Sequence, residues 1–109
     1  GGFDQREGCL VLYFTGQLDA YSEKQFTKYV NDVLASNQLS VVIDLSNIDF
    51  IDSSGLGAMV QTAKKCNKSK RSFLFVGNSR VKQTIKLVRL EEFLHLQPDL
   101  NTAISKLVI

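Results

Sequence analysis

One stretch decides the fold: from Ser40 to Cys66 the chain reads SVVIDLSNIDFIDSSGLGAMVQTAKKC. Its first part, Val41 to Leu45, is a short apolar run of high β propensity, which is typical of a strand covered on both faces of a parallel sheet. Its second part carries apolar residues at the spacing of one helical face, namely Leu56, Met59, Val60 and Ala63. We therefore predict a buried strand, a short loop and then a helix.

The predicted helix begins beside two serines. Asp52 can serve as its N-cap, because a carboxylate accepts hydrogen bonds from the free amides of a first helical turn. With Asp52 as the cap, Ile51 and Leu56 occupy the two positions of a hydrophobic staple, which favours this start. Ser53 and Ser54 then lie in the first turn and point largely outward. Ser53 as the cap itself remains an alternative.

A phosphate on Ser53 would be tolerated for a physical reason. The free amides and the positive end of the helix dipole favour an anion at this place. The phosphate adds about −1.5 to −2 charges at neutral pH, next to Asp52 and near Asp49. A partner docked on this surface would be repelled while the fold survives, as a switch requires. The simpler interpretation, in which the serines only begin a helix, stays open on spacing alone.

The first part of the chain predicts a hairpin and a helix. Cys9 to Thr15 is a nearly continuous apolar run and reads as a central strand, and Phe3 to Arg6 is predicted to pair with it across a Glu-Gly turn. A helix is expected from about Ala20 to Ser36. Two starts compete, either Asp19 as the cap or a capping box of Ser22 and Gln25.

The second half continues the alternation of strands and helices. We predict a strand at residues 72–76, a helix capped by Asn78 or Ser79, a short fifth strand at residues 93–96 and a last helix opened by Pro98 and Asp99. The third helix is expected to turn three residues inward: Val81, Ile85 and Val88. The chain is therefore predicted to be one α/β domain over residues 1–109, with a mixed, mostly parallel sheet of about five strands and about four helices.

Composition excludes several classes of protein. The chain has 109 residues, 44% of them hydrophobic, and a net charge of +2, which is too small to argue for direct nucleic-acid binding. No apolar run approaches the ~20 residues of a membrane span, and the start does not resemble a signal peptide. Cys9 and Cys66 belong to no metal-ligand cluster. We expect a cytoplasmic protein with two reduced cysteines and no metal or other cofactor.

Other polar groups suggest no chemistry of their own. The cations from Lys64 to Arg71 follow a helix end, where they complement the dipole, and they lack the interleaved aromatics of a nucleic-acid surface. His95 is the only histidine and sits in a predicted strand, and no nucleophile elbow or phosphate-binding glycine loop is present. We therefore expect no enzymatic activity.

Two motifs carry a resemblance to a known family. The run from Asp52 to Gly57, DSSGLG, follows VIDL at residues 42–45, and this combination closely resembles the signature of the STAS domain, named for sulphate transporters and anti-sigma-factor antagonists. Upstream, Gly16-Gln-Leu-Asp19 is similar to the Gly-x-Leu-Asp element of that family. The resemblance covers the chain from about Gly8 to its end, including the order of elements.

The resemblance implies a regulatory role. In the bacterial anti-sigma-factor antagonists, the serine after the motif Asp is phosphorylated by an anti-sigma factor that is a serine kinase; here that serine is Ser53. The unphosphorylated form binds the kinase and frees a sigma factor, and a serine phosphatase restores that form. The expected partner-binding residues are Asp19, Asp52, Ser54, Gly55, Leu56 and Gly57, with Asp19 near enough to hold or orient the acceptor serine.

Two other readings stay open. The chain could be a STAS scaffold or regulatory subunit of a larger signalling or transport complex, which predicts a stable complex that does not depend on Ser53 phosphorylation. It could instead bind a small ligand, for example a nucleotide bound weakly, which predicts saturable binding by the isolated domain.

Overall fold

The computed structural model describes residues 2–107 of the chain. Its elements follow one another as β1 (Gly2–Arg6), β2 (Cys9–Leu18), α1 (Glu23–Ser36), β3 (Ser40–Ile51), α2 (Ser53–Lys68), β4 (Phe73–Gly77), α3 (Ser79–Leu87), β5 (Leu96–Gln97) and α4 (Leu100–Leu107). The sheet has the order β1-β2-β3-β4-β5; β1 is antiparallel to β2, and the remaining pairs are parallel. This mixed, mostly parallel α/β architecture confirms the predicted fold class.

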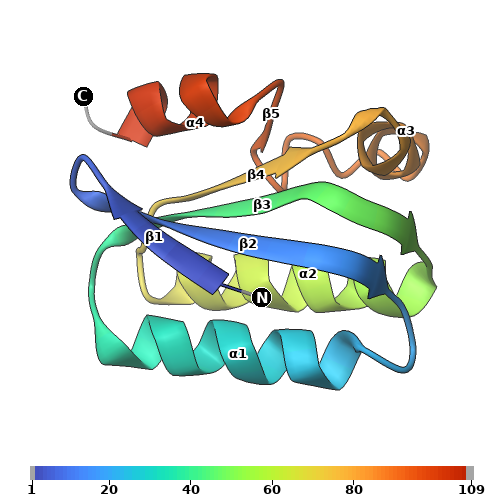
Figure 1. The fold of residues 1–109 in the computed structure, drawn as a ribbon, viewed down its shortest axis with the longest axis horizontal. Coiled ribbons are helices and arrows are strands. Elements are labelled where there is room, and N and C mark those ends of the chain that lie inside the picture. Colours follow the sequence, from blue (N-terminus) through green and yellow to red (C-terminus); the bar gives the residue numbers. More distant parts are fainter. Residues whose placement is uncertain (1, 108–109) are drawn as a thin grey trace.

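Two hydrophobic layers cover the sheet. Helices α1 and α2 lie side by side beneath one face, and α4 lies against the other (Figure 1). Alternate residues of β3 separate into these layers, because successive side chains of a strand point to opposite faces. Val41 and Ile43 join the large core under α1 and α2, whereas Val42 joins the smaller core under α4. The central strands are therefore buried on both faces, as their continuous apolar sequence predicts.

Strand β3 is longer than predicted, and the prediction of a short loop between this strand and the second helix is wrong. β3 continues past Leu45 to Ile51 because β2 pairs with it along the whole length, through two register shifts. Beyond the end of β4, the side-chain amide of Asn78 donates hydrogen bonds to the carbonyls of Ser46 and Ile48, at 3.0 and 2.8 Å. Long-range contacts thus extend the strand.

The predicted fifth strand is displaced. It occupies Leu96–Gln97 rather than residues 93–96, because the preceding residues form turns in which His95 has a φ of +52°. The His95 ring stacks on Phe73 with centroids 4.5 Å apart, and its Nδ1 lies 3.0 Å from the Phe73 carbonyl oxygen. The lone histidine therefore packs on the first residue of β4.

Val88 does not point inward as predicted. Helix α3 ends at Leu87, so that Val88 is the C-cap and is 47% exposed, whereas Val81 and Ile85 are buried as expected. The apolar spacing continued past the true helix end, and spacing alone cannot show where a helix stops.

Arg71 joins three segments at the amino ends of the parallel strands. Its guanidinium donates hydrogen bonds to the carbonyls of Leu34 (2.7 Å), Leu39 (3.3 Å) and Asn37, the C-cap of α1. The group is half-buried and ties the end of α1 to the start of β3. Arg71 therefore stabilises the fold, whereas the lysines next to it in the sequence lie on the surface.

Both cysteines are free and buried. Burial raises the pKa of the Cys9 and Cys66 thiols, so that both favour the neutral form. Over residues 2–107 no helix combines the length and apolar character that a bilayer crossing needs. In the same part of the chain, no three His, Cys, Asp or Glu side chains cluster as metal ligands would.

Candidate functional site

The candidate site lies where β2 and β3 end. At this edge the chain leaves β2 for a turn that leads into α1, and it leaves β3 directly for α2 (Figure 1). We call this region, residues 19–22 together with residues 49–54, the Ser53 edge. In open α/β sheets the carboxyl ends of the parallel strands are the usual place for binding groups, because side chains from separate loops converge there.

Asp52 links the two parts of the Ser53 edge. One of its carboxylate oxygens accepts a hydrogen bond from the Gly55 amide at 3.0 Å, which confirms it as the N-cap of α2. The other oxygen accepts a hydrogen bond from the Ala20 amide at 3.3 Å. The main chain adds a third link, since the Asp52 amide donates to the Leu18 carbonyl at 3.3 Å.

Ser53 is left with a free hydroxyl. It is the first residue of α2, its side chain is exposed, and no hydrogen bond between described residues uses its Oγ. Asp52 fills the capping position, so the alternative in which Ser53 caps the helix is wrong. Ser54 is half-buried beside it, and Asp49 is exposed nearby in the sequence. The edge therefore presents a hydroxyl at a helix start among carboxylates.

Asp19 shapes the turn between β2 and α1. Its carboxylate accepts hydrogen bonds from the amides of Tyr21 (3.0 Å) and Ser22 (3.1 Å). The Ser22 hydroxyl in turn donates to the Gln17 carbonyl at 2.7 Å, and no cap bond from Ser22 is formed. Helix α1 begins at Glu23 with Ser22 in the N-cap position, so the second predicted start is correct in place, although the capping box with Gln25 does not form. Within the described residues, every hydrogen bond of the Asp19 carboxylate is internal to this turn.

The two motif glycines differ in their surroundings. Gly55 is buried, and a Cβ atom there would run into the backbone carbonyl of Leu18. Gly57 is exposed, and a Cβ atom there would meet nothing within 4 Å. Leu56 is half-buried against the main core. Of the predicted contact residues in α2, Gly57 is therefore open to a partner, whereas Gly55 lets α2 approach β2.

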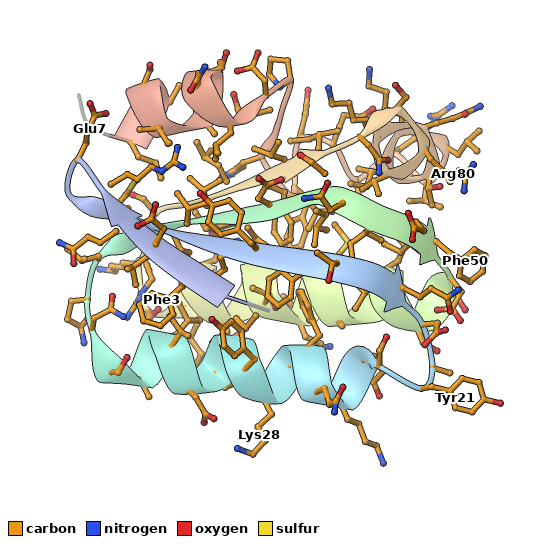
Figure 2. All side chains as sticks on the ribbon, in the orientation of Figure 1. Phe3, Glu7, Tyr21, Lys28, Phe50 and Arg80 are labelled. Atoms are coloured by element: carbon orange, nitrogen blue, oxygen red, sulfur yellow. The ribbon has the colours of Figure 1, made fainter. Side chains whose placement is uncertain are left out.

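Two aromatic residues of the Ser53 edge were missed from the sequence. Tyr21 is 96% exposed and Phe50 is 48% exposed, and both rings lie at the same end of the molecule (Figure 2). A signal for Tyr21 existed, because it falls outside the apolar stripe of α1 that begins at Phe26. Phe50 had none, since it was placed in a loop that proved to be strand.

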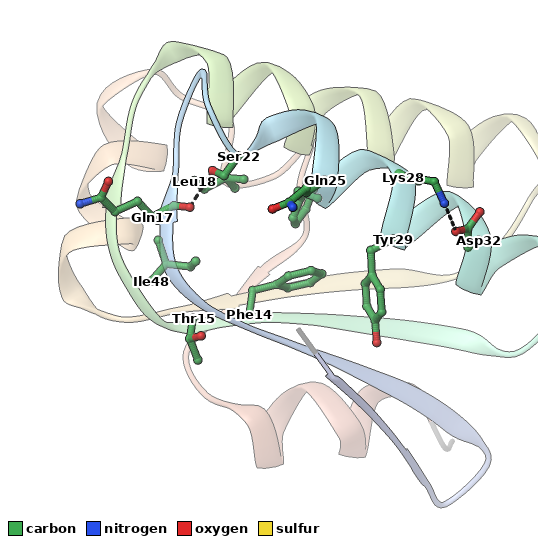
Figure 3. A pocket seen from close by; sticks show the side chains of 11 residues that line it. Phe14, Thr15, Gln17, Leu18, Ser22, Gln25, Lys28, Tyr29, Asp32 and Ile48 are labelled. Atoms are coloured by element: carbon green, nitrogen blue, oxygen red, sulfur yellow. Dashed lines mark hydrogen bonds and ion pairs between the residues drawn. The ribbon is translucent and has the colours of Figure 1, made fainter.

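A hollow of about 440 Å³ lies beside the edge, between α1 and the outer side of β2 (Figure 3). It opens where the pairing of β1 with β2 stops at Tyr13. Its lining includes the rings of Phe14, Phe26 and Tyr29, and the ammonium of Lys28 is already paired with Asp32 at 3.1 Å. This lining offers aromatic surface and amides rather than a cradle for phosphates, and Ser53 is not part of it.

Comparison with known proteins adds independent findings. A family model described as the STAS domain matches residues 3–103. The anti-sigma-F factor antagonist RsfB of Mycobacterium tuberculosis is 28% identical over 98 residues, which cover 90% of this chain and 80% of that protein. The anti-sigma-B factor antagonist of Staphylococcus aureus is 24% identical over 82 residues, covering 74% and 76% respectively.

A solved structure is similar in three dimensions. The crystal structure of an anti-sigma factor antagonist from Mycobacterium paratuberculosis aligns with a TM-score of 0.88 at 25% identity. The alignment covers 96% of this chain and 90% of that chain. The similarity therefore extends over nearly the whole fold.

Proposed function

The chain belongs to the STAS domain family, and from this premise we propose that it is an anti-sigma-factor antagonist controlled by phosphorylation of Ser53. In the unphosphorylated form it sequesters an anti-sigma factor that is a serine kinase, and a sigma factor is freed. The kinase transfers phosphate to Ser53 and dissociates, and a serine phosphatase returns the protein to its binding form. Residues 1–109 act as one domain in the cytoplasm.

The observation that carries the proposal is the unused hydroxyl of Ser53. The helix start needs one capping side chain, and Asp52 supplies it with a hydrogen bond to the Gly55 amide. The Ser53 side chain is exposed and contributes no hydrogen bond to the described fold. A hydroxyl in this position can be modified without loss of a structural contact.

Electrostatics explain how phosphate would act. The first-turn amides and the dipole of α2 favour an anion at Ser53, so the phosphorylated protein stays folded. The added charge, about −1.5 to −2 at neutral pH, joins those of Asp52 and Asp49. A partner that accepts the unmodified edge would meet a much more negative surface. Binding is then lost through repulsion at the interface.

The surroundings of the histidine support a binding role without catalysis. His95 lies against Phe73 at the start of β4, and its Nδ1 faces a backbone carbonyl. No hydrogen bond among residues 2–107 joins this ring to a serine or cysteine. A nucleophile activated by a base needs such a pair, and the proposal therefore assigns Ser53 the role of substrate for another enzyme.

Mass spectrometry of the protein purified from its native cells tests the proposal. Intact mass with fragmentation should find a species heavier by one phosphate, located at Ser53. Ser53→Ala should remain unmodified and retain the kinase constitutively, whereas Ser53→Asp should bind it more weakly. Ser79→Ala is the matched control, because it removes an exposed serine hydroxyl at the first residue of α3, and it should behave as the parent protein. A stable complex that ignores all three substitutions would instead support the scaffold function.

A further inference from the structure

Resting on the proposed function, we propose that Tyr21 and Phe50 are the aromatic anchors by which the Ser53 edge binds the anti-sigma factor kinase. We assign Asp19 to the same surface as a positioning residue that acts through Tyr21. Asp19 thereby has a role different from holding the acceptor serine.

Exposure sets these two rings apart. Tyr21 is 96% exposed and Phe50 48%, although aromatic side chains gain free energy when they leave water. The other large exposed apolar residues between residues 2 and 107 lie elsewhere: Phe3 on β1, and Leu87 with Val88 at the end of α3. Single exposed apolar residues are ordinary, but both of these aromatics lie within two residues of the contact between Ala20 and Asp52, beside the candidate serine. Tyrosine is also among the residues that most often dominate protein interfaces.

The backbone beneath Tyr21 is fixed. The Tyr21 amide donates to the Asp19 carboxylate at 3.0 Å, and the neighbouring Ala20 amide donates to Asp52 at 3.3 Å. Asp52 directly precedes Ser53, so these bonds hold the tyrosine turn next to the acceptor serine. The ring extends into solvent from an ordered turn. Binding would therefore have to order only the side-chain torsions of Tyr21, because its backbone is already fixed.

The backbone beneath Phe50 is fixed as well. Phe50 is paired with Gln17 in the parallel ladder of β2 and β3. The preceding carbonyl, that of Asp49, accepts a hydrogen bond from the Arg80 guanidinium at 2.8 Å. Figure 2 shows Tyr21, Phe50 and Arg80 at the same end of the molecule, with Phe3 away from them.

The charge around the rings indicates what covers them. Three carboxylates, those of Asp19, Asp49 and Asp52, lie on the Ser53 edge, and one guanidinium, that of Arg80, adjoins it at the Asp49 carbonyl, so negative charge predominates. Carboxylates repel nucleic-acid phosphates and anionic lipid headgroups. The fitting partner is a protein surface with two apolar recesses and a basic rim, and the kinase that must reach Ser53 is the protein brought to this place by the proposed function.

The test uses the purified kinase, identified as the protein that phosphorylates Ser53, and measures its Kd by calorimetry. Tyr21→Ala and Phe50→Ala should each weaken binding by about tenfold or more, as hot-spot truncations do. Phe3→Ala and Leu87→Ala are matched controls, because they remove apolar groups elsewhere whose exposure, 61% and 77%, lies between those of Phe50 and Tyr21, and they should change Kd by less than about twofold. Thermal melts should show that all four variants stay folded.

The outcomes separate this inference from the proposed function. If the kinase phosphorylates Ser53 and binds all four variants like the parent, the anchoring role of Tyr21 and Phe50 is refuted, whereas control by phosphorylation of Ser53 is still supported. If the controls weaken binding as much as Tyr21→Ala and Phe50→Ala do, the surface is not localised and the inference also fails. If no kinase modifies Ser53, the proposed function is refuted, and the inference, which rests on it, is refuted as well.

A double-mutant cycle tests the role of Asp19. If Asp19 acts through Tyr21, Asp19→Ala should weaken binding and add little to Tyr21→Ala, since both remove the same contact. Asp19→Asn keeps an acceptor oxygen for the turn and should restore most of the binding. Additive losses in the double variant, with slower phosphorylation of Ser53, would instead mean that Asp19 acts on the serine.

Discussion

The two ends of the sheet use their polar groups in opposite ways. At the amino ends of the parallel strands, the Arg71 guanidinium is consumed by the carbonyls of Leu34, Asn37 and Leu39. At the carboxyl ends, the hydroxyl of Ser53 is free and the ring of Tyr21 is almost fully exposed. At the amino end the polar side chain stabilises the fold through internal hydrogen bonds, whereas at the carboxyl end side chains remain accessible to a partner.

The difference teaches that a polar residue must be judged by its contacts rather than by its type. Arg71 belongs to a basic tract that reads as a solvated surface, yet it joins α1 to β3. Ser53 belongs to a motif that reads as a helix cap, yet Asp52 does the capping. Substitutions at the two ends should therefore separate stability from binding.

The largest effect is expected at the amino end. Arg71→Ala leaves three carbonyls without their charged donor, and the free energy of unfolding should fall by about 3 kcal/mol. Urea denaturation measures this loss, and Arg71→Lys should recover only part of it because one ammonium cannot span the three acceptors. The exposed Lys64→Ala is the control and should stay within about 0.5 kcal/mol. Equal losses for Arg71→Ala and Lys64→Ala would show that the hydrogen bonds of Arg71 to the three carbonyls add no stability of their own.

The motif glycines provide a matched pair. Gly55→Ala forces α2 away from the Leu18 carbonyl and should destabilise the protein by about 2 kcal/mol. Gly57→Ala meets open space and should stabilise α2 by about 0.5–1 kcal/mol, since alanine is the better helix former. Thermal denaturation of both variants checks the signs. If Gly57→Ala stabilises the fold while weakening the kinase complex, Gly57 lies in the interface.

Asp52 tests whether the carboxyl end also contains structural groups. Asp52→Ala removes the cap of α2 and the link to Ala20, and we expect a loss of about 1–2 kcal/mol. Asp52→Asn keeps the acceptor for Gly55 and should lose less. Chemical denaturation gives both values. A variant as stable as the parent would show that the link to the tyrosine turn contributes nothing.

The smallest change in stability is expected for Ser53→Ala, and it gives the sharpest test of the difference between the two ends. Ser53→Ala should change stability by less than about 0.5 kcal/mol, because the hydroxyl makes no described contact. Ser22→Ala, a serine on the same edge, loses the bond to the Gln17 carbonyl and should cost about 1 kcal/mol. Parallel urea titrations compare the two serines. A larger loss for Ser53→Ala would assign its hydroxyl a structural role and weaken the switch.

Much of the architecture was predictable because it depends on local pattern. Apolar runs place β2 and β4, helical spacing places α2, and Asp52 is recognisable as a cap from the staple formed by Ile51 and Leu56. The position of Ser53 at the helix start follows from that cap. These features need only neighbours within a few residues, and such neighbours are visible in the sequence.

The remaining features depend on residues far apart in the chain. β3 runs to Ile51 because Asn78 and β2 hold it, and the guanidinium of Arg71 finds its acceptors more than thirty residues upstream. Whether Gly55 is a packing position, and whether Tyr21 faces water, depends likewise on which elements lie across from it. By itself the sequence determined the order of elements, the cap and the candidate serine. The tertiary structure alone decided which polar groups form hydrogen bonds within the fold and which remain free, because that outcome depends on contacts between distant segments.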